Sequence, residues 1–115
     1  MPDSRVEGAI EFIRTNLSAA LSVELIATGV GLSSSRLAHL FKLDVGISLM
    51  SYTRQRRIEL AQELLQSTSK PLKEIAFEVG MPDVRHFGKV FRQVCRYPPS
   101  SRRNRDWQDP TPFYP

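Results

Sequence analysis

The chain carries one sequence pattern twice, first over residues 23–47 and again over residues 72–97. In each copy an Ile-Ala pair is followed, four residues after the alanine, by a glycine, and an aromatic-basic pair stands further on. The matched residues are Ile26, Ala27, Gly31, Phe41 and Lys42 in the first copy and Ile75, Ala76, Gly80, Phe91 and Arg92 in the second. A small residue, a glycine and a second amphipathic segment are what two short helices need to cross at a steep angle. Because the copies lie roughly 50 residues apart, chance is a poor explanation, and we predict two helix-turn-helix units.

Apolar residues recur at the spacing of an α-helix along nearly the whole chain, and no segment has the pattern of a strand. We therefore predict an all-α protein with one helix-turn-helix subdomain over 3–47 and a second over 67–106. A long linker helix over 48–66 is expected to join them. The segment 107–115 holds three prolines and is predicted to be irregular, and a short seventh helix is expected from Ser100 onward.

Residues that favour helix ends mark the expected boundaries. The expected starts lie at Asp3, Ser22, Ser33 or Ser34, Ser48, Pro71 and Asp83, and the expected ends at Gly29 or Gly31, Gly46, Gln66, Gly80 and before Pro98-Pro99. In the second helix of each copy the predicted core faces consist of Leu37, Leu40 and Phe41, and of Val84, Phe87, Val90, Phe91 and Val94.

The second helix of the second copy carries a basic stripe. Arg85, Lys89, Arg92 and Arg96 are spaced four, three and four residues apart, so they fall within about 60° of one another, opposite the apolar face. Taken alone, such a stripe is more often a solvated helix face. Here it lies on the helix that a helix-turn-helix inserts into the major groove, which favours a DNA-binding role. Gly88 flanks the stripe. Glycine inside a helix costs about 1 kcal/mol of stability against alanine, so we expect a compensating role, in which the missing side chain lets the helix approach a base edge or the backbone closely.

The second helix of the first copy is less charged. Ser35, His39 and Lys42 are expected to point away from the core, with Arg36 and Ala38 on the flanks. Serine and histidine can form hydrogen bonds with base edges or phosphates, and the Ala38 methyl could meet a thymine methyl.

Charge and composition limit the classes of function. The chain has 16 Lys and Arg against 12 Asp and Glu, and residues 84–105 hold seven of the basic residues and no acid. That excess favours an anionic partner. No apolar run reaches membrane-spanning length, the N-terminus lacks the pattern of a secretion signal, and the single cysteine excludes an internal disulfide.

Catalysis and metal binding are not expected. The sequence has no Gly-rich phosphate loop, no metal-spaced His/Cys cluster and no credible nucleophile–base pair. His39 as a metal ligand is a weaker alternative, because the other soft ligands, His86 and Cys95, lie in the other copy. Glu59 and Glu63 could be a carboxylate pair, but a solvated helix face suits them better. We therefore predict no enzyme, no cofactor and no metal site.

Three longer segments carry a family resemblance. They read IATGVGLSSSRLAHLFK, then GISLMSYTRQRRIELAQELL, then PLKEIAFEVGMPDVRHFGKVFR with the closing PPSSRR. Together they resemble, over residues 5–103, the DNA-binding domain of the AraC/XylS family of bacterial transcription regulators. The resemblance implies two helix-turn-helix subdomains joined by a long helix. Their recognition helices, at about 34–44 and 84–94, would enter successive major-groove segments on one face of the duplex.

A linker helix over 49–66 would span about 27 Å, which is compatible with recognition helices about one DNA turn, or 34 Å, apart. Because the two copies differ in sequence, the resemblance implies an asymmetric DNA site.

The resemblance also assigns DNA contacts by position. Base contacts would fall on Ser35, Arg36, Ala38, His39, Val84, Arg85, His86, Gly88 and Lys89. Phosphate contacts would fall on Ser33, Ser34, Lys42, Arg54, Asp83 (through the backbone N–H at its helix start), Arg92 and Arg96.

The chain departs from the family pattern at three points. Met81 stands where the family usually has Phe, which is a tolerable exchange in a core. Arg96 stands where a glycine usually ends the sixth helix, so that turn is expected to differ or the helix to run on. The first recognition helix is poor in long polar side chains, which weakens the expectation of strong base reading there.

The resemblance implies double-stranded DNA and RNA polymerase as partners, activation of transcription, and a place in the bacterial cytoplasm with the nucleoid. This domain is expected to bind DNA as a monomer and not to associate with a membrane. It is expected to be dimeric if it is part of a longer regulator. Many relatives carry a separate effector-binding or dimerisation domain, so the chain is expected to be either a stand-alone member or a fragment of a longer regulator. Its start close to the first helix favours the fragment. The alternative, from another class of protein, is a helical protein-interaction module whose basic face meets an acidic partner. The ratio of affinities for a specific and a random DNA duplex would distinguish this alternative from a DNA-binding protein.

Overall fold

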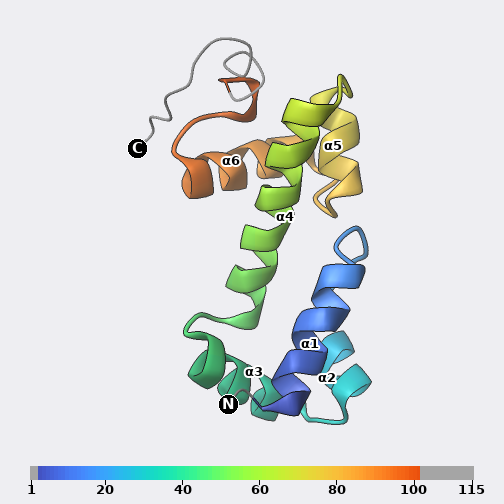
Figure 1. Cartoon of the computed structure of the whole chain (residues 1–115), viewed down its shortest axis with the longest axis vertical. Coiled ribbons are helices and arrows are strands. Elements are labelled where there is room, and N and C mark those ends of the chain that lie inside the picture. Colours follow the sequence, from blue (N-terminus) through green and yellow to red (C-terminus); the bar gives the residue numbers. More distant parts are fainter. Residues whose placement is uncertain (1–2, 102–115) are drawn as a thin grey trace. The chain divides into compact units, whose positions relative to one another are not determined.

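The computed structural model describes residues 3–101, and these form helices joined by short loops (Figure 1). The helices are α1 (Ser4–Thr15), α2 (Val23–Val30), α3 (Ser34–Val45), α4 (Leu49–Ser67), α5 (Leu72–Glu78) and α6 (Val84–Cys95). The described part of the chain contains no strand, which confirms the all-α prediction. Helical backbone begins again at Pro99 and continues to Ser101, and the rest of the expected seventh helix lies outside the described residues.

The chain divides into two compact units, one up to Arg56 and one from Arg57 onward, so the boundary falls inside α4. The first part of α4 contributes Leu49 to the core of the first unit, and its later turns contribute Ile58 and Leu65 to the core of the second. The expected linker helix is therefore a structural part of both units.

In the first unit, α1, α2 and α3 pack against one another. Their buried side chains form a core of Val6, Ala9, Ile13, Ile26, Ala27, Leu37, Phe41 and Leu49. The ring of Tyr52 from α4 meets Phe41 edge-on, with 5.4 Å between the ring centroids. Both sequence signals used above, the Ile-Ala pair and the later phenylalanine, are thus residues of this core.

The second unit has a core of the same kind, made by α4, α5 and α6. Its buried residues are Ile58, Ala61, Leu65, Ile75, Ala76, Val79, Met81, Phe87, Val90 and Phe91. Phe91 lies between Phe87 and Tyr97, with centroid distances of 5.9 and 5.8 Å. Met81 is buried, as expected for a tolerable exchange in a core.

The turns after α2 and α5 have the same backbone geometry. Gly31 and Gly80 both have left-handed backbones, with φ of 77° and 83°. The next residue in each copy then donates its N–H back to the repeated alanine, from Leu32 to Ala27 O and from Met81 to Ala76 O, both at 2.9 Å. Because an L-residue with a side chain rarely adopts this φ, the glycine of the sequence repeat suits the turn better than a residue with a side chain.

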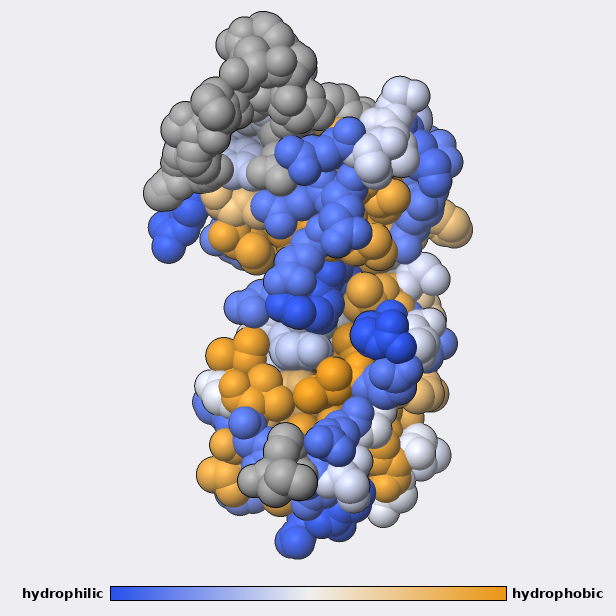
Figure 2. Space-filling model, viewed as in Figure 1, coloured by the Kyte–Doolittle hydropathy of each residue, from blue (hydrophilic) through white to orange (hydrophobic). Residues whose placement is uncertain are grey.

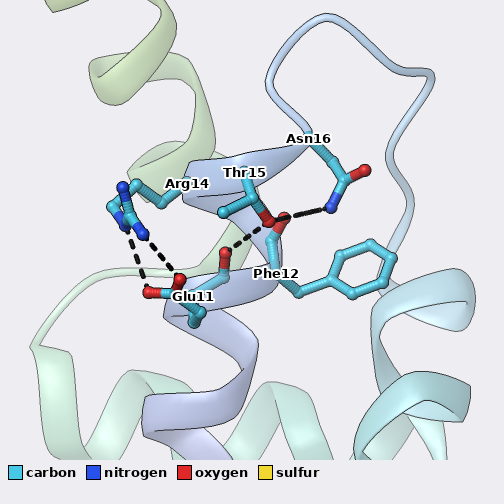
Figure 3. Close-up of polar contacts among 5 residues, drawn as sticks. All are labelled: Glu11, Phe12, Arg14, Thr15 and Asn16. Atoms are coloured by element: carbon cyan, nitrogen blue, oxygen red, sulfur yellow. Dashed lines mark hydrogen bonds and ion pairs between the residues drawn. The ribbon is translucent and has the colours of Figure 1, made fainter.

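Side chains satisfy the ends of α1. The Asp3 carboxylate accepts the Arg5 backbone N–H at 2.8 Å, and hydrogen bonds from Arg5 lower the pKa of Asp3 to about 2. At the other end, Asn16 Nδ2 donates to the Phe12 carbonyl at 2.8 Å and Thr15 Oγ1 donates to the Glu11 carbonyl at 2.9 Å (Figure 3). Phe12 is one of the last four residues of α1, so its carbonyl lacks a partner inside the helix and the Asn16 amide supplies one.

Candidate nucleic-acid interface

α6 is divided lengthwise into a buried and an exposed face. Phe87 and Phe91 are buried in the core, whereas Arg85, Lys89 and Arg92 are exposed. The three cations follow one another at spacings of four and three residues, so they share one side of the helix. α6 itself contains no acid, and the structure therefore places three cations together on a solvent-facing helix surface.

Two valines near the ends of α6 are more exposed than predicted. Val84 and Val94 were expected to be buried with Phe87, but their exposed fractions are 40% and 42%. Val84 is the first residue of α6, and Val94 is the last but one. The core prediction was therefore wrong at these two positions, and Val84 is accessible, as its predicted base contact requires.

Asp83 caps the start of α6. Its carboxylate oxygen Oδ1 accepts the backbone N–H groups of Arg85 at 3.0 Å and His86 at 3.3 Å. The carboxylate thus already occupies two of the N–H groups that a phosphate could use, and its negative charge stands at the same helix end. A phosphate contact predicted at Asp83 has to be made beside this carboxylate.

Arg96 ends α6 and does not extend it. The helix runs to Cys95, and Arg96 has a left-handed backbone with φ of 73°, donating its N–H to the Arg92 carbonyl at 2.8 Å. Two expectations are thereby corrected: the helix does not run on, and Arg96 is not a fourth helical member of the basic stripe. The left-handed residue turns the chain, so Arg96 leaves the helical spacing after Arg92.

Gly88 is not required by the packing of the second unit. It has a helical backbone, and a Cβ built at this position would meet no atom within 4 Å. Alanine would therefore fit without displacing any residue. The expectation that Gly88 permits close approach of a ligand is consistent with this open space.

α3 presents the first set of predicted contacts. Ser35, Arg36, Ala38, His39 and Lys42 are all exposed, on the side away from the buried Leu37 and Phe41. Ser33 caps the helix by accepting the Arg36 N–H at 3.2 Å. Ser34 is half-buried in the first turn.

Arg54 lies on α4 and is exposed. Its guanidinium donates to Ser51 Oγ at 3.1 Å, and Ser51 Oγ in turn accepts the Ser48 hydroxyl at 3.0 Å. The side chain is thus oriented along the first turns of the helix while its charge remains accessible to an anion.

One further exposed residue of α3 is not among the predicted contacts. Leu43 follows His39 by one helical turn and is 69% exposed. In Figure 2, hydrophobic surface is visible in the region where α3 ends and α4 begins, among hydrophilic residues. The helical spacing alone would have placed Leu43 beside His39 on the outer face.

Comparison with known proteins assigns the family. Residues 26–105 match the family model described as "Helix-turn-helix domain". The arabinose operon regulatory protein of Salmonella typhimurium is 36% identical over 102 residues, which cover 88% of this chain and 36% of that protein. Regulatory protein SoxS of the same organism is 31% identical over 100 residues, which cover 87% of this chain and 94% of that protein.

A solved structure of similar fold comes from Chromobacterium violaceum and is described as a transcriptional regulator of the AraC-type DNA-binding domain-containing proteins. It superimposes with a TM-score of 0.84 at 29% identity and covers 92% of this chain and 95% of that one. The chain therefore belongs to the AraC family of helix-turn-helix transcription regulators. It spans about a third of the length of the arabinose operon regulatory protein that it matches.

Two negative observations apply to residues 3–101 only. None of the helices described there is long and apolar enough to cross a membrane. Within the same residues, no three His, Cys, Asp or Glu side chains gather where they could hold a metal ion.

Proposed function

We propose that this chain binds double-stranded DNA sequence-specifically and regulates transcription, with α3 and α6 entering successive major-groove segments. The observation that carries the proposal is the exposed face of α6, where Arg85, Lys89 and Arg92 stand opposite a buried apolar face. Cations on a helix that fits the major groove can meet both guanine edges and phosphates. The names of the relatives, as regulators, point in the same direction.

Each side chain has a proposed role. Arg85 and Lys89 read base edges from α6, with Val84, His86 and Gly88 beside them at the groove floor. Arg92 in the last turn of α6 and Arg96 just after it contact phosphates, and the backbone N–H groups at the start of α6 contact a phosphate beside Asp83. On α3 and α4 the proposed base contacts are Ser35, Arg36, Ala38 and His39, and the proposed phosphate contacts are Ser33, Ser34, Lys42 and Arg54.

The chain binds as a monomer in this proposal, because each unit carries its own recognition helix. Since α3 and α6 present different side chains, one half of the DNA site differs from the other. For the regulator as a whole we propose activation of transcription through contact with RNA polymerase.

Selection of bound duplexes from a random-sequence library tests the proposal. The expected result is enrichment of one asymmetric site spanning two adjacent major-groove segments, bound by one chain per duplex. Recovery of duplexes without a shared sequence would contradict sequence-specific recognition. Weak, sequence-independent binding together with tight binding to an acidic protein would favour the protein-interaction alternative.

A further inference from the structure

The outer face of α3 contains an open hollow of about 500 Å³ lined by Ala38, His39, Lys42 and Leu43. All four residues belong to one helix, so the hollow is a feature of α3 alone. Ala38 precedes Lys42 by four residues, and His39 precedes Leu43 by four residues. On a helix surface, such a set surrounds a single depression between two turns.

The small side chain of Ala38 keeps this depression open. Helical side chains lean toward the N-terminus, so Lys42 and Leu43 extend back over the turn that carries Ala38 and His39. The Ala38 methyl is too short to fill the space beneath them. The result is a recess with an apolar floor and an apolar wall, bordered by an amine on one side and an imidazole on the other.

The chemistry of the recess limits what can occupy it. Leu43 is 69% exposed and so offers an apolar surface to a ligand. In the major groove, the apolar group that a base presents is the 5-methyl of thymine. Lys42 at the border carries the charge that suits a neighbouring phosphate, and Ser35 and His39 extend the same face of α3. The recess is therefore continuous with the proposed DNA-contacting surface.

We propose that Ala38 and Leu43 form a receptor for a thymine methyl, and that Leu43 is a specificity-determining residue of the first half-site. This inference rests on the proposed function, because it names what α3 recognises once DNA is bound. It also accounts for a recognition helix with few long polar side chains: α3 reads an apolar group by contact, whereas α6 reads polar base edges.

Replacing thymine by deoxyuridine tests the inference, because deoxyuridine keeps the base pair and removes only the methyl. Each thymine of the selected duplex is replaced in turn, and the binding constant is measured for each duplex. Burial of one methyl contributes about 0.8 kcal/mol, so one replacement should weaken binding about fourfold. Replacements of the other thymines that face α3 should change binding by less than about twofold.

Protein variants test whether the sensitive thymine methyl is bound between Ala38 and Leu43. Leu43→Ala removes the wall and Ala38→Leu fills the recess, and both residues are exposed, so the fold should persist. In both variants the effect of the sensitive thymine replacement should shrink to less than about twofold. Leu25→Ala is the matched control, since Leu25 is an exposed leucine of the same unit that lies on α2, and it should keep the fourfold effect.

The possible outcomes distinguish a failure of the methyl receptor from a failure of the proposed DNA-binding function. If a preferred duplex exists but no deoxyuridine replacement weakens binding, the methyl receptor is wrong and DNA recognition stands. If a sensitive thymine exists and remains equally sensitive in Leu43→Ala and Ala38→Leu, the methyl lies elsewhere and the inference fails. If no duplex is preferred at all, the proposed function itself is contradicted.

Discussion

Gly46 and Arg96 occupy equivalent positions in the two units and share a left-handed backbone. Each follows the last residue of its second helix, with φ of 95° for Gly46 and 73° for Arg96. Each donates its N–H to the carbonyl of the basic residue of the repeat, Lys42 at 2.9 Å and Arg92 at 2.8 Å. The second unit thus makes with an arginine the turn that the first unit makes with a glycine.

This relationship predicts that Arg96→Gly stabilises the second unit. A residue with a side chain costs about 1–2 kcal/mol in the left-handed region, part of which the greater freedom of glycine in the unfolded chain offsets. We expect a net gain of about 0.5–1 kcal/mol, measured from urea unfolding. The control is Gly46→Ala, where a new Cβ would meet no atom within 4 Å, so its expected loss of about 1 kcal/mol reports the backbone alone. A loss of stability in Arg96→Gly would mean that side-chain contacts of Arg96 outweigh the strain.

The proposed footprint predicts a steep dependence of DNA binding on salt. If two to four other basic side chains join the four cations proposed as phosphate contacts, so that six to eight meet phosphates, the logarithm of the binding constant should fall against the logarithm of salt concentration with a slope of about −5 to −7. Binding to the selected duplex between 50 and 300 mM salt, roughly, measures this slope. A slope shallower than about −2 would reject a footprint that extends over both units.

Ala76→Asp should unfold the second unit. Ala76 is fully buried where α5 packs on α6, and a buried carboxylate without a partner costs about 3–5 kcal/mol. The neighbouring change Phe77→Asp is a matched control, because Phe77 is 69% exposed and should cost less than about 1 kcal/mol. Unfolding followed by circular dichroism distinguishes the two. Equal melting temperatures for both variants would mean that Ala76 does not lie at the helix crossing.

Asp83→Asn should strengthen DNA binding without loss of stability. Asparagine can still accept the N–H groups of Arg85 and His86, but it removes a negative charge from the helix start. We expect all duplexes to bind roughly two- to fivefold more tightly, in line with the modest value of one exposed charge. Asp83→Ala loses the cap and should cost about 1 kcal/mol of stability. Unchanged or weaker binding by the asparagine variant would show that no phosphate lies near residue 83.

Much of the fold follows from local rules that can be read in the sequence. Gly31 and Gly80 lie in left-handed turns, Ser22 and Ser33 accept N–H groups at helix starts, and α4 begins and ends within one residue of its predicted bounds. These features depend on a few neighbouring residues, so the spacing along the chain is sufficient to predict them.

The failed predictions concern residues whose burial or backbone conformation depends on their surroundings in the fold. Helical spacing treats every turn alike, yet Val84 and Val94 are exposed because the helix ends beside them. Leu43 has apolar chemistry but an outer-face position that helical spacing could have shown, and its exposure in the structure makes it a candidate contact. The left-handed backbone of Arg96 runs against its local preference and is imposed by the way the chain turns after α6.

The most direct test of DNA recognition compares Arg85→Ala with Arg92→Ala, on the selected duplex and on a random duplex. Arginine can hold a guanine with two hydrogen bonds, so Arg85→Ala should cost about 1–3 kcal/mol on the selected duplex, relax the preference at one base pair and leave random DNA little affected. Arg92→Ala should weaken both duplexes alike and reduce the salt slope by about one. If Arg85→Ala instead weakened both duplexes equally, Arg85 would contact a phosphate, and the account of α6 as a reader of base sequence would be contradicted.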